Sequence, residues 1–492
     1  MAAATDGPAV DARALLAADA RALLTAEQQR FAARHPRSRQ AFESGQRHYL
    51  YGAPSHWMRR WAGGFPLTVA SAQGAHLECI DGHDYVDFCL GDTGAMCGHG
   101  PPAVTAAVSA QLARGATLML PTEDAEWVGE ELRRRFGLPY WGFTTSASDA
   151  NRAAIRIARM ATGREKVLVF SGCYHGSVEE AHVALQDGQV VMRNGIHPNA
   201  VDHARVSKVI EFNDVAALEA SLADRDVACV LAEPLMTNYG MILPTPGFHA
   251  ALRELTRRSG TLLVIDETHT LSNGPGGCTA LQHLEPDLFV VGKAIGGGIP
   301  VGLYGASAEV AQRLWALVPK VNPVEVRQSS HLGFGGTLAG SALQVAAVRA
   351  VLGQVLTGAA FEHMIARATD LAQRARAIIA AHGLDWYVEQ SGARVEFLFA
   401  PRPPRNAADV ARDRDGTLES LLHVYFMNRG VLITPFHCML LMCPATTGSD
   451  VDACLRVLGE FCATLRPAVS GAAAATATAA AVPAATARGP RA

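Results

Sequence analysis

The 492-residue chain lacks several features that would each assign it to a particular class of protein. No apolar run approaches the roughly 20 residues that a membrane-spanning helix needs. The formal net charge is only -3, so no excess of positive charge favours a nucleic acid or an anionic membrane. No GxGxxG motif opens a helix after a strand, which argues against a nicotinamide oxidoreductase. We therefore expect no membrane and no nucleic-acid partner.

Cysteine pairs are also missing. The ten cysteines include no CxxC pair, and several lie inside apolar runs. This pattern predicts buried free thiols in a reducing compartment, with neither a disulfide framework nor a metal site. Acids and arginines interrupt the alanine-rich N-terminal stretch, so we expect no secretory signal. A hydrophobic share of 49% and a charged share of 18% are typical of globular proteins, and we expect a cytoplasmic enzyme.

The chain does contain an alternation of strand and helix patterns. Apolar, β-prone runs at 167–170, 227–232 and 261–265 alternate with helical patterns at 103–114 and 247–259. This order predicts an α/β fold, with a mostly parallel sheet in a large domain and a smaller α+β domain beside it. The expected segments are a helical N-terminal extension (1–48), a segment that completes the small domain (49–100), the large domain (101–340), the C-terminal small domain (341–466) and a disordered alanine-rich tail (467–492).

Lys293 is the most informative single residue. It follows the apolar run 288–291 and precedes three glycines at 296–298, which leave room for a flat ligand and for movement of the ammonium. A second apolar run, 261–265, ends in Asp266. Either residue alone is common on a surface or at a helix cap. A lysine and an aspartate at two strand ends together indicate a pyridoxal phosphate (PLP) site, in which lysine forms a Schiff base and aspartate keeps the pyridinium nitrogen protonated.

Other short segments add to this indication. Ser146, Ala147 and Ser148 open a predicted helix, where free N–H groups and the helix dipole suit a phosphate, although a plain N-cap is the commoner role of such a segment. Tyr174 and its neighbour His175 follow the strand at 167–170 and offer a flat aromatic ring. Glu233 closes the strand at 227–232, and Thr337 follows a flexible pair of glycines.

Together these motifs resemble the class III, fold-type I PLP-dependent aminotransferases, above all the glutamate-1-semialdehyde aminomutase-like branch and its ω-transaminase relatives. The resemblance covers roughly residues 52–466 and implies a seven-stranded sheet in a PLP-binding large domain. The matching motifs, in chain order, are Gly98-His99, Pro121-Thr122-Glu123, Gly172 to Gly176, Glu233-Pro234, Asp266-Glu267, Pro286-Asp287, Gly292-Lys293, Gly296 to Pro300 and Gly336-Thr337.

The resemblance implies a role for each matching residue. Lys293 corresponds to the Schiff-base lysine, and Asp266 to the carboxylate that pairs with the pyridinium nitrogen. Tyr174 corresponds to the aromatic ring stacked on the cofactor, and Thr268 to the residue on the opposite face of the ring. His269 falls where relatives often carry a group near the ring hydroxyl, although a packing role is equally open.

The phosphate end of the cofactor is implied in the same way. Ser146 and Ser148 correspond to the phosphate cup, in which Ala147 replaces the usual glycine. Thr337 corresponds to a threonine that reaches the phosphate of the neighbouring subunit, so we expect a homodimer with its site at the interface. The expected cofactor-binding residues are Ser146, Ala147, Ser148, Tyr174, His175, Glu233, Asp266, Thr268, His269, Lys293 and Thr337.

The substrate pocket departs from the family pattern. Relatives that bind a carboxylate hold it with an arginine where this chain has Trp57. Arg59 and Arg60 are close to that position but out of register, so a loop shift could restore the contact. Asp92 either faces the cofactor, which would favour a cationic or neutral amine, or caps a turn. Arg394 is a further candidate for pocket polarity, with a structural role also open.

These residues predict a PLP-dependent transaminase that moves an amino group from an amine or amino acid to a keto acid or aldehyde by ping-pong chemistry. An amine-type donor, as in ω-transaminases, is the first expectation. The alternatives are a glutamate-1-semialdehyde-type aminomutase, a β-amino acid transaminase or an amino-acid racemase. A non-catalytic PLP-fold subunit is disfavoured because it would need neither Lys293 nor Asp266.

Overall fold

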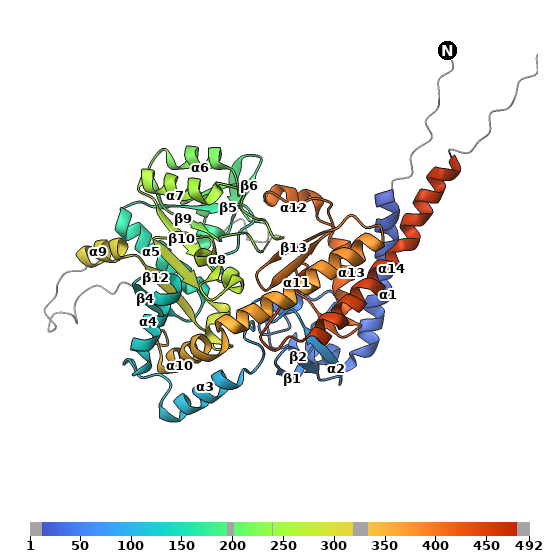
Figure 1. Cartoon of the computed structure of the whole chain (residues 1–492), viewed down its shortest axis with the longest axis horizontal. Coiled ribbons are helices and arrows are strands. Elements are labelled where there is room, and N and C mark those ends of the chain that lie inside the picture. The colour runs from blue at the N-terminus through green and yellow to red at the C-terminus, as the bar shows by residue number, and fades with distance from the viewer. Residues whose placement is uncertain (1–11, 194–200, 239, 318–332, 480–492) are drawn as a thin grey trace, which may run out of the picture.

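The computed structural model describes residues 12–193, 201–238, 240–317 and 333–479 (Figure 1). The chain forms a larger lobe built on one sheet and a smaller lobe that contains both ends of the described chain. The long helix α11 (Gly358–Ala381) runs from the larger lobe to the smaller one.

The larger lobe is built on a sheet that has seven strands within the described residues, in the order β4-β12-β11-β10-β9-β5-β8. Strand β12 is antiparallel to both of its neighbours, and the other pairs are parallel. This confirms the expected mostly parallel seven-stranded sheet of an α/β fold. The strands are β4 (Tyr140–Thr144), β5 (Lys166–Phe170), β8 (Ser207–Ile210), β9 (Val227–Ala232), β10 (Leu262–Asp266), β11 (Leu288–Val291) and β12 (Gly302–Ala306).

Helices cover this sheet because its central strands are buried along their whole length. Every residue of β9, β10 and β11 is buried, as expected for apolar runs covered on both faces. Helix α5 packs across several strands through small buried alanines such as Ala150 and Ala154. The helices of this lobe are α3 (Pro102–Arg114), α4 (Asp124–Phe136), α5 (Ala147–Thr162), α6 (Val215–Leu222), α7 (Phe248–Ser259), α8 (Gly277–Leu281), α9 (Ala308–Leu317) and α10 (Ala342–Ala350).

The smaller lobe joins segments from the two ends of the chain. Strand β3 pairs in parallel with β15, which brings the N-terminal meander beside the C-terminal segment. One sheet is β1 (Val69–Gln73), β2 (His76–Cys79), β3 (Asp84–Asp87) and β15 (Val431–Leu432); the other is β13 (Tyr387–Ser391), β14 (Arg394–Leu398) and β16 (Met439–Leu441). Two of its helices are α12 (Ala407–Asp413) and α13 (Gly416–Met427). The hairpin of β6 (Val183–Gln186) and β7 (Gln189–Met192) lies against β8 in the larger lobe.

The C-terminal helix extends further than the sequence predicted, whereas the N-terminal helices lie within the predicted extension. Helix α1 (Ala12–Arg34) lies beside α14 (Gly448–Ala479), and α2 (Pro36–Gly45) follows a break at His35 (Figure 1). The predicted disordered tail begins at residue 467, whereas α14 continues to Ala479 through an alanine-rich segment, and alanine has the highest helix propensity. The rest of the predicted tail, 480–492, lies outside the described residues.

The segment that leads from α10 into α11 is not one continuous α-helix. Helix α10 ends at Ala350 and continues as a π-helical turn, η7 (Val351–Val355), before the chain bends into α11. No single helix in the described ranges is long and apolar enough to cross a membrane. The bent pair made of residues 342–355 and 358–381 meets that test by length and composition alone.

All ten cysteines are free and buried, and their burial agrees with the prediction from the apolar runs around them.

Candidate active site

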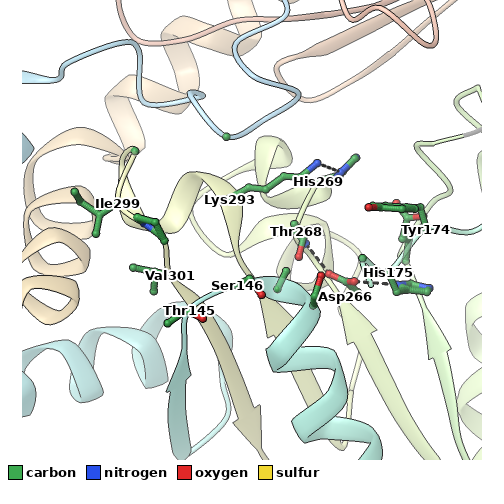
Figure 2. A pocket seen from close by; sticks show the side chains of 17 residues that line it. Thr145, Ser146, Tyr174, His175, Asp266, Thr268, His269, Lys293, Ile299 and Val301 are labelled. Atoms are coloured by element: carbon green, nitrogen blue, oxygen red, sulfur yellow. Dashed lines mark hydrogen bonds and ion pairs between the residues drawn. The ribbon is translucent and has the colours of Figure 1, made fainter. Parts of the chain in front are cut away.

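A cavity of about 330 Å³ lies where the parallel strands end (Figure 2). Asp266 is the last residue of β10, Glu233 follows β9, and Lys293 follows β11 after one glycine. Carboxyl ends of parallel strands meet at one edge of a sheet, which is where such folds bind ligands. The lining residues are Gly94, Thr145, Ser146, Ala147, Ser148, Tyr174, His175, Gly176, Glu233, Asp266, Thr268, His269, Lys293, Gly298, Ile299, Pro300 and Val301.

Asp266 is the best-supported carboxylate of the cavity. Its Oδ2 accepts a hydrogen bond from Asn151 Nδ2 (2.8 Å) and lies 2.9 Å from His175 Nδ1, while its Oδ1 accepts one from the backbone N–H of Thr268 (3.0 Å). Burial opposes ionisation, but His175, Thr268 and Asn151 outweigh it and lower the pKa of Asp266 to about 2. The carboxylate is therefore ionised at neutral pH.

His175 is held charged by the same contacts. Burial alone would lower its pKa, but Cys173 and Asp266 raise the pKa of His175 to about 10. Its Nε2 is buried and has no hydrogen-bond partner among the described residues. His175 and Asp266 therefore form a buried ion pair in the cavity wall, with one ring nitrogen still able to donate a proton.

Lys293 reaches across the cavity toward His269 (Figure 2). Its backbone is in the left-handed region (φ 50°) at the start of a short 3-10 turn, η5 (Lys293–Gly296), which turns the side chain away from the strand. The Nζ atom lies 2.8 Å from Asp92 Oδ2 and is also hydrogen-bonded to His269 Nε2. A strained backbone of this kind persists where the surrounding structure requires it, as at functional sites.

The first turn of α5 forms another wall of the cavity. Ser146 is the N-cap, and its Oγ accepts a hydrogen bond from the backbone N–H of Asp149 (3.2 Å). Ser148 Oγ accepts one from the backbone N–H of Ser177 (2.9 Å). N–H groups in the first turn of a helix have no partner within it, and the helix dipole adds a positive potential there. This turn can therefore hold an anion, and Ser146 also serves as the predicted cap.

A group of aromatic side chains adjoins the cavity through Tyr174, which lines it. Tyr174 contacts Trp57 edge-on at 5.7 Å between ring centroids, and Trp57 lies 5.3 Å from Phe436. The guanidinium of Arg60 lies over the rings of Trp57 (5.3 Å) and Phe436 (5.7 Å). Arg59, in the same 3-10 turn η1 (His56–Arg59) as Trp57, is exposed. Of the two arginines beside Trp57, Arg60 is thus the one that contacts these rings.

The sequence left open whether Asp92 faces the cofactor site or only caps a turn. Its carboxylate contacts Lys293 in the structure, so it faces the site. Burial opposes its ionisation, yet Lys293, His269, His437 and Arg394 hold the pKa of Asp92 well below its usual range. Its backbone is left-handed (φ 50°), as is that of Thr93 (φ 79°). The carboxylate is therefore a fixed negative charge beside the lysine.

Arg394 and Thr337 lie outside the cavity lining. Arg394 is buried, and its Nη2 donates to Thr93 Oγ1 (2.6 Å), so it supports the loop that carries Asp92. Thr337 is exposed. All other residues of the expected cofactor-binding set line the cavity.

Two residues of the site were not found from the sequence. Asn151 lies one turn into α5 and bonds Asp266, and Thr237 bonds both Glu233 and His269. Asn151 interrupts the alanine-rich buried face of its helix, which was a usable signal. No local pattern singled out Thr237. Within the described ranges, no group of three or more His, Cys, Asp or Glu side chains is arranged to hold a metal ion.

Comparison with known proteins identifies the family. A model described as aminotransferase class-III matches residues 57–451, so the chain belongs to the class-III aminotransferases, which are fold-type I, PLP-dependent enzymes.

Individual relatives carry more specific names. The chain is 34% identical over 356 residues, covering 71% of its length and 80% of the relative, to a glutamate-1-semialdehyde 2,1-aminomutase of Anaeromyxobacter sp.. A solved glutamate-1-semialdehyde-aminomutase variant from Pseudomonas aeruginosa PAO1, in complex with PMP, is 52% identical with a TM-score of 0.89, covering 91% of this chain and 99% of that one. A β-phenylalanine aminotransferase from Variovorax paradoxus is 28% identical with a TM-score of 0.79, covering 92% and 98%.

The residues of the cavity fit PLP. The cofactor carries a phosphate, a flat ring and a ring nitrogen that must stay protonated. The cavity supplies a helix N-terminus, the ring of Tyr174 and the ionised carboxylate of Asp266. Thr268 Oγ1 and Glu233 Oε1 are buried polar atoms without a hydrogen-bond partner among the described residues, as expected of a wall that faces a polar ligand.

Proposed function

We propose that this chain is a PLP-dependent aminomutase of the glutamate-1-semialdehyde type, which moves an amino group between neighbouring carbons of one small molecule. The observation that carries the proposal is a lysine and an ionised aspartate at adjacent strand ends of one cavity, in a chain 52% identical to the Pseudomonas aeruginosa aminomutase. This similarity favours the aminomutase over the amine-type transaminase that the sequence suggested first.

Each reacting group has a proposed task. PLP supplies a ring that withdraws electrons from the bond being broken at the substrate carbon. Lys293 would hold the aldehyde form of the cofactor covalently, and its neutral amine, once released, would take a proton from one carbon and return it to another. Asp266 keeps the ring nitrogen protonated, because its carboxylate stays ionised at neutral pH. His175 and Asn151 hold that carboxylate in place.

The other walls would bind the remaining parts of the cofactor. The first turn of α5, with Ser146 and Ser148, would hold the phosphate through backbone N–H groups and hydroxyls. Tyr174 and Thr268 would contact the two faces of the ring. Arg60, beside Trp57 at the opening, is the proposed contact for a substrate carboxylate distant from the reacting carbons.

An assay without a keto acid tests this proposal. Purified protein loaded with pyridoxamine phosphate is given glutamate-1-semialdehyde alone, and the isomer with its amino group on carbon 1 is measured. We expect many turnovers per site, and none for Lys293→Ala. Turnover that requires an added keto acid would replace the aminomutase with a transaminase. Failure of the protein to form any lysine-dependent absorbance band with PLP would overturn the cofactor role of Lys293.

Transamination of an amine donor is the second candidate, and Asp92 favours it. An ionised carboxylate 2.8 Å from Lys293 Nζ repels a substrate carboxylate attached to the reacting carbon and attracts a cationic donor. Addition of 1-phenylethylamine to the PLP-loaded protein distinguishes the candidates. Bleaching of the visible band, followed by recovery with a keto acid, would support the transaminase.

A further inference from the structure

Lys293 is connected to Glu233 by an unbroken chain of side-chain hydrogen bonds. Lys293 Nζ contacts His269 Nε2, and the opposite ring nitrogen, Nδ1, lies 2.8 Å from Thr237 Oγ1. Thr237 Oγ1 in turn lies 2.5 Å from Glu233 Oε2. His269, Thr237 and Glu233 are all buried, so this chain runs through the protein and not through solvent. Figure 2 shows its first contact, between Lys293 and His269.

The hydrogen bonds of this chain all point in one direction. Thr237 has a single hydroxyl proton, and it donates that proton to Glu233. Its oxygen therefore accepts from His269 Nδ1–H, which makes His269 Nε2 the ring nitrogen with a free lone pair. That lone pair faces the Nζ of Lys293. Each donor is thus aimed from the lysine toward the glutamate, the arrangement that proton transfer along a hydrogen-bonded chain requires.

The charges around the two ends favour movement in this direction. Glu233 faces His175, Asp266, Arg394 and Cys173, and burial raises the pKa of Glu233 to about 7, so the carboxyl can accept a proton near neutral pH.

His269 faces a second set of charges, made up of Lys293, Asp92, Arg394 and Asp266. Burial, followed by the charge of Lys293, holds the pKa of His269 well below its ordinary value, so the ring passes a proton on and does not keep it. Asp92 also contacts Lys293, but its pKa is too low for it to accept a proton.

We propose that His269, Thr237 and Glu233 form a proton relay that removes a proton from Lys293 and so prepares its amine for reaction. The Lys293 ammonium gives a proton to His269 Nε2, His269 gives its Nδ1 proton to Thr237, and Thr237 gives its hydroxyl proton to Glu233. The net change converts an ammonium and a carboxylate into an amine and a carboxylic acid, with no outside reagent. This relay rests on the proposed function, in which Lys293 is the reactive amine.

The rate at which cofactor-free protein binds PLP covalently tests the relay. Absorbance reports the rate between about pH 5.5 and 9, and it needs no substrate turnover. In the unmodified protein we expect the rate to rise through an inflection near the pKa of Glu233, about 7. Thr237→Val keeps the shape of the side chain and removes the hydroxyl, so the inflection should vanish and the rate above pH 7 should fall roughly tenfold or more. Thr237→Ser is the matched control and should keep both.

Glu233→Gln provides an independent variant, because it cannot accept a proton but can still bond Thr237. It should also lose the inflection, and thermal unfolding of each variant shows whether the fold is retained. An inflection that persists in Thr237→Val or in Glu233→Gln, while labelling still requires Lys293, would overturn the relay alone. Covalent loading of Lys293→Ala at the normal rate would overturn both the relay and the proposed function.

Discussion

At the scale of single residues, Asp92 and His269 determine the surroundings of the lysine. Lys293 Nζ contacts both side chains, one a permanent negative charge and the other a neutral ring. Asp92 stabilises the Lys293 ammonium, whereas His269 is proposed to accept a proton from it. We expect the balance between these two contacts to control how readily the Lys293 amine reacts. Substitution of Asp92 and substitution of His269 should therefore have different effects on substrate binding and on the reactivity of the amine.

Asp92→Asn should change donor preference. The substitution keeps the shape of the side chain and removes its charge, so a diamine such as 1,4-diaminobutane should lose roughly tenfold in kcat/KM, about 1.4 kcal/mol. A donor with a carboxylate beside the reacting carbon should gain. Steady-state kinetics with both donors and with neutral 1-phenylethylamine measure the change. Equal loss for all three donors would show that Asp92 acts on Lys293 and not on the substrate.

The pair made by His175 and Asp266 should shape stability against pH. The pKa of Asp266 is lowered from 3.8 to about 2, so its contribution is present above about pH 4 and is lost as the pH falls through 2. The pKa of His175 is raised from 6.5 to about 10, so its contribution is full below pH 6.5 and is lost as the pH rises through 10.

The Tm of the cofactor-free protein should therefore fall between pH 6.5 and 10, and His175→Gln should flatten this alkaline limb. Calorimetry at a series of pH values measures both curves. An alkaline limb of the same slope in the variant would exclude the pair as its cause.

At the scale of elements, the site depends on the close approach of β11 to the first turn of α5. A Cβ on Gly292 would lie 2.7 Å from the Cβ of Ala147 and 3.0 Å from its backbone nitrogen, so only glycine allows this contact. The contact places the lysine that follows β11 next to the helix turn proposed to hold the phosphate. Both the position of the lysine and that of the turn therefore depend on one small residue.

Gly292→Ala should destabilise the protein by about 1–3 kcal/mol, as overpacking does, and weaken PLP binding by moving the turn of α5. Gly129→Ala is a matched control, because Gly129 lies within α4 and its added Cβ would meet nothing within 4 Å. That control should stabilise the protein by about 0.5–1 kcal/mol. Denaturant unfolding and PLP titration of both variants measure these effects. Equal effects of the two substitutions would refute the steric explanation.

At the scale of the whole molecule, exposed apolar side chains suggest a second subunit. Leu118, Met119 and Leu120, between α3 and α4, are 42%, 79% and 70% exposed. Leu338, beside Thr337, is 56% exposed. Large apolar groups clustered in this way are typical of a surface that is buried on association. A homodimer would cover them, and it would give Thr337 a partner that it lacks within the cavity of its own chain.

Light scattering should therefore report a dimer, and charged substitutions such as Met119→Asp with Leu120→Asp should produce a monomer that binds PLP at least tenfold more weakly. Thr337→Ala should remain dimeric yet also lose affinity, since only a phosphate contact is removed. A monomer with unchanged PLP affinity would contradict the expectation that the site is shared between subunits.

The sequence by itself determined the parts of this protein that depend on near neighbours. The continuous apolar runs at β9 and β11 coincide with the observed strands, because burial on both faces leaves a signal that needs no knowledge of the fold. Lys293 and Asp266 were found for the same reason, since Asp266 ends one such run and Lys293 follows another after a single glycine. The segment after residue 466 was predicted to be disordered because it has few bulky side chains, and α14 continues through it to Ala479, where helix propensity is high.

Only the tertiary structure decided which side chains surround Lys293. Asp92 lies 201 positions earlier in the chain, and the sequence left open whether it faced the site or capped a turn. Thr237 had no local signal, yet it joins Glu233, four positions earlier, to His269, 32 positions later. Contacts of this kind form only when long loops close and several strands end at one edge of a sheet. Sequence periodicity and spacing carry no information about such long-range contacts. The series of hydrogen bonds that connects Lys293 to the carboxyl group of Glu233 can therefore be seen only in the folded molecule.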